Sequence, residues 1–134
     1  MNEELDSRTK LIFLLHFAVS ALFGLTMLLI PDFLVELYNT TLVEPNIRLL
    51  GGAVVGYGVG SGLAYLASNW EQVRIKVLME LPWTAAAAVV LLWLLIQGEV
   101  AGLFWLNFGL FALFFAAFFA LYWRYELAPE PSTA

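Results

Sequence analysis

The sequence contains no cysteine, which excludes a disulfide, a thiolate nucleophile and a cysteine-based metal or iron–sulfur site. Charged residues are also scarce: they make up 13% of the chain, whereas soluble domains carry about 25%, and 62% of the residues are apolar. The net charge of −5 and the scattered cations argue against a nucleic-acid partner. No basic segment precedes a short apolar stretch, so we do not expect a cleaved signal peptide. Composition therefore predicts an integral membrane protein.

Four apolar segments each approach the roughly 20 residues that a helix needs to cross about 30 Å of hydrocarbon. They cover residues 11–30, 47–68, 75–97 and 100–123. We therefore expect an all-α fold, an integral membrane four-helix bundle spanning residues 11–125. A polar segment of residues 1–10 precedes the bundle, and a flexible tail of residues 126–134 follows it.

Lysine and arginine predict the orientation of the four spans. All but one of these residues flank the spans on one side: Arg8, Lys10, Arg74, Lys76 and Arg124. Arg48 alone lies on the other side. Because cytoplasmic loops retain lysine and arginine, we expect both termini in the cytoplasm. The expected location is a prokaryotic cytoplasmic membrane.

The one long connection, residues 31–46, begins with Pro31 and Asp32. Asp32 can cap a short helix over residues 33–38, whose apolar pattern suits a helix lying in the outer interface of the membrane. An ordered loop that dips into the lipid headgroups is the alternative.

The second span is rich in glycine: six of the ten glycines lie in residues 51–62, GGAVVGYGVGSG. At about 100° per residue, Gly52, Gly56 and Gly60 form one stripe, and Gly51, Gly58 and Gly62 form another. Small residues let membrane helices approach closely, so two stripes predict a helix-packing role with a close neighbour on each side. Alternatively, the glycines open a slot for a flat ligand such as a quinone or a lipid tail.

The fourth span carries two different faces. Aromatic residues at spacings of three and four form a ridge of Phe104, Phe108, Phe111, Phe115, Phe118 and Tyr122. Small residues form a second stripe of Gly109, Ala112, Ala116 and Ala120. We expect the small stripe to pack inside the bundle, and the ridge to face lipid or another subunit.

Ionisable residues within a span are expensive and are candidates for function. His16 in the first span and Glu80 in the third lie at similar depth, with Tyr65 and Tyr122 somewhat nearer the cytoplasm. All four helices thus bring a polar side chain toward one layer. This layer predicts either a proton-handling or headgroup-binding cluster around a pair of His16 and Glu80, or a polar clamp that only orients the helices. Glu80 can alternatively extend toward Arg74 or Lys76.

Arg48 begins the second span on the outer side. We expect its guanidinium to reach Glu44 or Asp32 and so to close the outer loop over the bundle. An anionic headgroup site is the alternative. Neither a catalytic set nor a metal-ligand set accompanies these residues, so the sequence favours no enzyme class.

Residues 48–68, RLLGGAVVGYGVGSGLAYLAS, place an arginine at the start of a glycine-rich span. In this stretch and in its four-span layout, the chain resembles the small bacterial membrane families related to DoxX. Some members of these families are subunits of quinone-linked oxidases, and the resemblance therefore implies an accessory role.

Two functions follow as expectations. The first is a small non-enzymatic protein that serves as an accessory or scaffold subunit of a membrane complex, or as a homo-oligomer. The second is a membrane unit that binds a quinone or lipid, or handles protons, at His16 and Glu80. Membrane lipid and other membrane subunits are the expected partners, and a quinone or lipid is the candidate cofactor.

Overall fold

The computed structural model describes residues 3–41 and 44–128, and these residues are almost entirely helical. The helices are α1 (Ser7–Leu29), α2 (Pro31–Tyr38), α3 (Glu44–Leu66), α4 (Trp70–Gln97) and α5 (Phe104–Tyr122). One π-helical turn, η1 (Trp123–Leu127), continues α5. Four helices, Ser7–Leu29, Glu44–Leu66, Trp70–Gln97 and Phe104–Leu127, are long and apolar enough to cross a membrane. The predicted all-helical fold with four candidate spans is therefore confirmed.

Two helices begin a few residues before the predicted spans, each at a capping side chain. The Asp6 carboxylate accepts a hydrogen bond of 2.8 Å from the backbone N–H of Thr9, so α1 begins at Ser7 rather than at residue 11. The Asn69 side chain accepts one of 3.3 Å from the N–H of Gln72, so α4 begins at Trp70 rather than at residue 75. Hydropathy marks the apolar part of a helix, whereas a cap determines its end.

The C-terminal boundary also differs from the prediction. The predicted flexible tail begins at residue 126, but η1 continues to Leu127. Glu126 accepts a hydrogen bond of 2.6 Å from the Trp70 indole N–H and pairs with Arg74 at 2.8 Å. These two partners attach the end of the last helix to α4. Residues 129–134 of the predicted tail lie outside the described residues.

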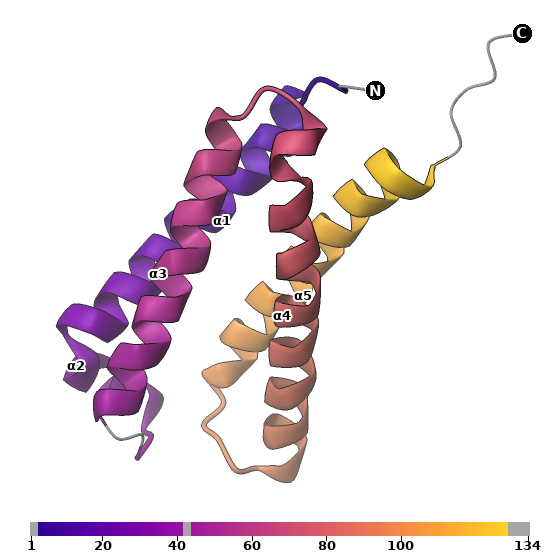
Figure 1. The fold of residues 1–134 in the computed structure, drawn as a ribbon. Coiled ribbons are helices and arrows are strands. Elements are labelled where there is room, and N and C mark those ends of the chain that lie inside the picture. Colours follow the sequence, from indigo (N-terminus) through magenta and orange to yellow (C-terminus); the bar gives the residue numbers. More distant parts are fainter. Residues whose placement is uncertain (1–2, 42–43, 129–134) are drawn as a thin grey trace, which may run out of the picture.

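The helices are arranged as two pairs, α1 with α3 and α4 with α5, and both termini lie at the same end (Figure 1). The α1/α3 pair is in close backbone contact. A Cβ atom added to Gly51 would lie 2.7 Å from Met27 Cβ and 2.9 Å from the carbonyl oxygen of Gly24. On the other side of this contact, a Cβ on Gly24 would lie 2.9 Å from the backbone nitrogen of Val55. Glycine is therefore required at both positions for the helices to approach this closely.

The two glycine stripes of α3 have different surroundings. Gly58 and Gly62 continue the contact with α1, because added Cβ atoms would lie 2.8 Å from Ser20 Cβ and 3.2 Å from the Phe17 ring. By contrast, an atom added to Gly52 or Gly56 would meet nothing within 4 Å. The prediction of a second closely packed helix beside Gly52 and Gly56 is therefore wrong, because no other described helix of the same chain approaches them.

Gly60, the third member of that stripe, faces a side chain rather than a helix. An added Cβ would lie 3.0 Å from Lys76 Cε. The α4 helix therefore reaches this face of α3 through the long stem of a lysine. Gly52, Gly56 and Gly60 therefore border an open surface of α3 rather than a close contact between two helices.

The faces of α5 differ from those predicted: the small stripe is exposed or half-buried, and Phe118 of the ridge is buried. Phe118 is fully buried and Phe114 is buried, whereas Ala116 is exposed and Ala112 is half-buried. The prediction that the small stripe packs inside the bundle is therefore wrong. Because α5 meets α1 through side chains with little close backbone contact, only large rings fill the space between them. The Phe118 ring packs 6.1 Å from that of Phe13.

The end of the bundle that carries both termini is held closed by contacts between distant parts of the chain. Arg124 donates a hydrogen bond of 2.7 Å to Asp6, and the Thr9 and Tyr125 hydroxyls lie 3.2 Å apart. The Arg124 hydrogen bond, followed by those from Thr9, holds the pKa of the Asp6 carboxyl well below its ordinary value of 3.8. We call this set of contacts, together with those of Glu126, the terminal clamp.

The connection between α3 and α4 joins the same clamp. The N–H of Leu5 donates to the carbonyl of Ser68 at 3.0 Å, and the N–H of Trp70 donates to the carbonyl of Glu3 at 2.9 Å. Trp70 is buried and its ring stacks on Tyr125 with centroids 4.7 Å apart. Chain segments from the beginning, middle and end of the sequence therefore meet at this end.

Candidate functional site

A cluster of four polar side chains lies between the two helix pairs. His16 Nδ1 on α1 lies 2.8 Å from the Ser61 hydroxyl on α3, and His16 Nε2 lies 3.7 Å from Glu80 Oε2 on α4. The other Glu80 oxygen accepts a hydrogen bond from Lys76, one turn earlier on α4. The cluster of His16, Ser61, Lys76 and Glu80 thus links three helices.

The two central side chains of the cluster are almost completely buried. Glu80 is 0% exposed and His16 is 5% exposed. Lys76 supplies the positive charge that a buried carboxylate requires. Because Nε2 of His16 faces that carboxylate, electrostatics favours a proton on Nε2, which leaves Nδ1 to accept from the Ser61 hydroxyl. The neutral imidazole then accepts a hydrogen bond at Nδ1 and points its Nε2–H group at the Glu80 carboxylate.

Two phenylalanines of α5 complete the surroundings of the imidazole. Phe114 and Phe118 meet the His16 ring edge to face, with centroids 4.7 and 5.2 Å away. Glu80 Oε2 is buried without a hydrogen-bond partner among the described residues. The layer is therefore polar on α1, α3 and α4 and aromatic on α5.

The structure brings His16 and Glu80 together but leaves Tyr65 and Tyr122 apart from them. Tyr65 is 39% exposed, and Tyr122 packs against the apolar core. In the part of the chain that the structure describes, neither hydroxyl has a hydrogen bond with His16 or Glu80. The expectation that every helix adds a polar group to this layer is thus wrong, because α5 contributes Phe114 and Phe118, and on α3 the polar group is Ser61 rather than Tyr65.

Ser61 was not selected from the sequence as a partner of His16. It lies within the glycine-rich run, on the face that packs against α1, next to Gly58. A hydroxyl on such a face has no water available, so its partner is either a carbonyl of its own helix or a polar group on the neighbouring helix. That requirement was the signal in the sequence.

Arg48 lies far from this cluster, at the start of α3. Its guanidinium pairs with Glu44 at 2.7 Å and donates to the backbone carbonyl of Leu28. Of the two predicted partners, Glu44 is therefore the one it contacts. The contact with Leu28 satisfies a carbonyl at the C-terminal end of α1, where helices lack intrahelical partners. Arg48 thus joins the two helices at the end opposite the termini.

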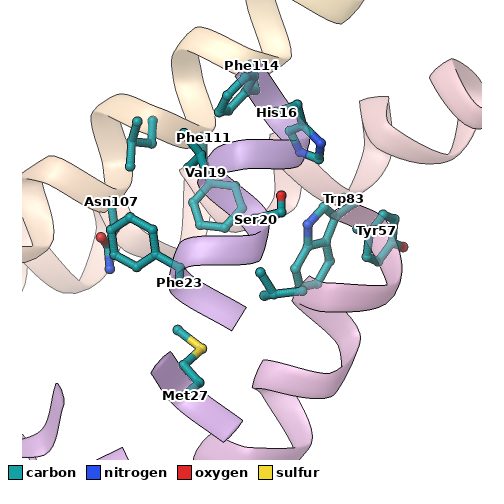
Figure 2. Close-up of a pocket in the computed structure, with 12 residues that line it drawn as sticks. His16, Val19, Ser20, Phe23, Met27, Tyr57, Trp83, Asn107, Phe111 and Phe114 are labelled. Atoms are coloured by element: carbon teal, nitrogen blue, oxygen red, sulfur yellow. The ribbon is translucent and has the colours of Figure 1, made fainter. Parts of the chain in front are cut away.

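A mostly apolar cavity of about 80 Å³ lies beside the polar cluster, and His16 lines one end of it (Figure 2). All four long helices contribute side chains. These include Ser20 and Phe23 from α1, Tyr57 from α3, Trp83 from α4, and Asn107, Phe111 and Phe114 from α5. Aromatic rings therefore form much of its wall.

A second cavity of about 260 Å³ continues the first toward α2. The two share six lining residues: Phe23, Met27, Val54, Trp83, Asn107 and Phe111. Leu34 and Tyr38 of α2 line the second cavity, together with partly exposed residues such as Val90. We call the two together the central cavity. Its lining runs from Leu34 and Tyr38 of α2 to His16 of α1.

One hydrogen bond crosses the wall of the central cavity. The Tyr38 hydroxyl donates to Asn107 Oδ1 at 2.7 Å and so ties α2 to α5. Burial raises the pKa of the Tyr38 phenol above its ordinary value of 10.0, which keeps the hydroxyl protonated. The carbonyl oxygen of Asn107 is therefore occupied, and its amide nitrogen remains.

A separate groove of about 700 Å³ lies between α3 and α4 on the outside of the bundle. Gly56, Gly60 and Ala64 form its α3 side, while Ile75, Lys76 and Met79 form its α4 side. This groove is the open surface that the Gly52 and Gly56 stripe borders. It is separated from the central cavity by the stacked rings of Tyr57 and Trp83, which lie 5.2 Å apart.

No group of three or more His, Asp or Glu side chains within residues 3–41 and 44–128 is placed to hold a metal ion. No protein-family model matches the sequence, and neither curated proteins nor solved structures give a match.

Proposed function

We propose that this chain is an integral membrane protein that binds an apolar, membrane-dissolved ligand in the central cavity. The observation that supports this proposal is the pair of adjoining cavities, which share six lining residues and together are lined from α2 to His16. Small-molecule sites are concave and mainly apolar, with a few placed polar groups. An apolar cavity of about 150 Å³ already admits benzene in a soluble protein. The outer part alone, at about 260 Å³, is larger.

In this proposal the polar cluster acts as the closed inner wall of the site. His16 contributes its ring to the cavity, while Glu80 lies behind it and holds it in place through Nε2. Ser61 and Lys76 fix the two ends of the arrangement. The cluster is thus a polar clamp that positions the imidazole, and a quinone or lipid remains the candidate ligand.

A cavity-filling substitution tests the proposal. Ala87 lines the outer part of the central cavity, whereas Ala86 on the same turn of α4 is exposed. We expect wild-type protein purified in mild detergent to carry apolar small molecules detectable by native mass spectrometry. Ala87→Phe should lose them and Ala86→Phe should keep them. Equal occupancy in both variants would remove the central cavity as the site.

The proposed orientation has both termini in the cytoplasm and α2 in the outer membrane interface. The clustering of Arg8, Lys10, Arg74 and Arg124 at the end that carries the termini supports it. Because the chain lacks cysteine, single cysteines can be introduced at Ser68 and Glu99, at opposite ends. We expect a membrane-impermeant maleimide to label the cysteine of Glu99→Cys in intact prokaryotic cells. The cysteine of Ser68→Cys should be labelled only after lysis.

A specific observation also favours the other expected function, that of an accessory subunit or homo-oligomer. Gly52 and Gly56 lie on an open stripe beside the groove between α3 and α4. Small-residue stripes are surfaces on which membrane helices associate. We expect Gly56→Leu to reduce the assembled fraction in mild detergent, and Val59→Leu, on an exposed position of the same helix, to leave it unchanged. A wild-type particle that is strictly monomeric and without a partner would exclude this function. The resemblance to DoxX-related families stays a prediction.

A further inference from the structure

Some of the polar groups that line the central cavity make no hydrogen bond with the rest of the described residues. Ser20, Trp83 and Asn107 line its inner part, from α1, α4 and α5 respectively (Figure 2). Within the described residues, neither the Ser20 hydroxyl nor the Trp83 indole N–H makes a hydrogen bond, and Asn107 uses only its carbonyl oxygen. Each of the three therefore has a donor available.

These donors lie where water is scarce. Ser20 is only 6% exposed, its Cβ faces Gly58 of α3, and its side chain lines the cavity. The rest of the wall is apolar and aromatic, from side chains such as Phe23, Met27 and Phe111. A donor that faces an apolar cavity without an acceptor costs free energy, and the lining of this cavity brings together three side chains with such donors.

We infer that the ligand of the central cavity is an apolar molecule that carries carbonyl-type acceptor oxygens. This inference rests on the proposed function and specifies its ligand. A pure hydrocarbon would fill the volume but would leave the donors of Ser20, Trp83 and Asn107 without acceptors. An acceptor-bearing molecule satisfies them and keeps its apolar body against the aromatic wall.

Two sources supply this chemistry within a membrane: the ring carbonyls of a quinone and the ester carbonyls of an acylglycerol lipid. Both offer carbonyl oxygens as acceptors. The flat wall formed by Trp83, which stacks on Tyr57 with rings 9° from parallel, suits a planar ring in particular. An ester fits the donors equally well, so the experiment separates the two.

The test uses pairs of probes with similar shape and different oxygens. Tetramethyl-1,4-benzoquinone and 1,2,4,5-tetramethylbenzene differ in the two carbonyl oxygens, and dioctanoylglycerol and its ether-linked analogue differ in the ester carbonyls. Binding to full-length protein in mild detergent is followed by calorimetry. We expect one carbonyl compound to bind at least tenfold more tightly than its partner.

Ser20→Ala, which keeps the Cβ atom at the α1/α3 contact, should reduce that preference about fivefold. Asn107→Leu should do the same. Thr26→Val, on α1 outside the central cavity, is the control and should leave it unchanged. A preference within the first probe pair identifies the ligand as a quinone. A preference within the second pair identifies it as an ester lipid.

Two negative results have different meanings. If the probes without carbonyl groups bind as tightly as the carbonyl compounds and Ala87→Phe blocks both, the cavity binds ligands but this inference is overturned. If no probe binds, the proposed function fails together with it. A preference that survives Ser20→Ala, Trp83→Phe and Asn107→Leu would also overturn the assignment of the donors.

Discussion

Glu80 Oε2 lies 3.7 Å from His16 Nε2, in the interior of the bundle, and has no hydrogen-bond partner among the described residues. The other oxygen of the same carboxylate pairs with Lys76. One carboxylate thus has two roles: one oxygen neutralises Lys76 and the other faces His16.

Glu80→Gln should destabilise the protein strongly, because it leaves the largely buried ammonium group of Lys76, at the edge of the outer groove, without a counter-charge. Breaking a buried ion pair on one side typically costs about 3–5 kcal/mol. Unfolding in mixed micelles measures the change in free energy. Replacing both members, Glu80→Gln with Lys76→Met, should recover a large part of the loss.

Glu71→Gln is the matched control for that variant, since Glu71 lies in the first turn of the same helix and is exposed. Its free energy of unfolding should stay within about 0.5 kcal/mol of wild type. If Glu80→Gln behaves like this control, the pair with Lys76 contributes nothing.

The contact between His16 and Ser61 should appear as a coupling energy. The two side chains hydrogen-bond at 2.8 Å across the α1/α3 interface. A double-mutant cycle with His16→Ala and Ser61→Ala should give about 0.5–1.5 kcal/mol of interaction free energy. Additive effects of the two substitutions would mean that the hydrogen bond does not stabilise the fold.

Neighbouring glycines of α3 should respond in opposite directions to alanine. A methyl group on Gly51 would lie 2.7 Å from Met27 Cβ, so Gly51→Ala should cost about 1–3 kcal/mol by forcing α1 and α3 apart. Gly52→Ala meets nothing within 4 Å, and its better helix propensity should stabilise the monomer by up to about 1 kcal/mol. Unfolding of both variants in the same detergent measures the contrast. Equal destabilisation would contradict the assigned helix faces.

Trp70→Phe should weaken the terminal clamp by removing the indole hydrogen bond to Glu126 at 2.6 Å. Hydrogen bonds to charged groups contribute about 1.5–3 kcal/mol. Thermal unfolding in detergent measures the loss. Trp123→Phe, at an exposed position of η1, should have little effect, and comparable losses in both variants would argue against the role of Glu126.

Asp6 predicts a pH dependence of the terminal clamp. Since the pKa of its carboxyl is lower in the folded chain than the ordinary 3.8, its contribution is complete above that value. The contribution disappears only as the pH falls through the lowered pKa of the folded state. The stability difference between wild type and Asp6→Asn should therefore stay constant from about pH 5 to pH 8 and shrink in strong acid. A difference that shrinks near pH 6 would implicate another group.

Composition and apolar length were sufficient to predict the four candidate spans and the proximity of His16 to Glu80. Both depend on quantities that a sequence carries directly, namely hydrocarbon thickness and the depth of a residue along a span. The α1/α3 contact was harder to predict. Glycine periodicity identifies small stripes on α3, but which stripe meets a helix depends on Gly24 and Ser20 of α1.

The faces of α5 could not be read from its own sequence. A small stripe and an aromatic ridge both pack well, and the choice depends on how far the neighbouring helix lies. Here Phe118 is buried against Phe13 and His16 of α1, a helix with which α5 has little close backbone contact, whereas Ala116 is exposed. The central cavity depends on the same spacing, which no single segment of the chain encodes.

The terminal clamp also bears on how the protein is made. Arg124, Tyr125 and Glu126 lie in the last helical turn, whereas their partners Asp6, Thr9 and Trp70 are synthesised earlier. The end of the bundle that carries the termini can therefore close only after the final span has been inserted. A chain that stops after the fourth span but before Arg124 would hold all its membrane helices and still have an open end.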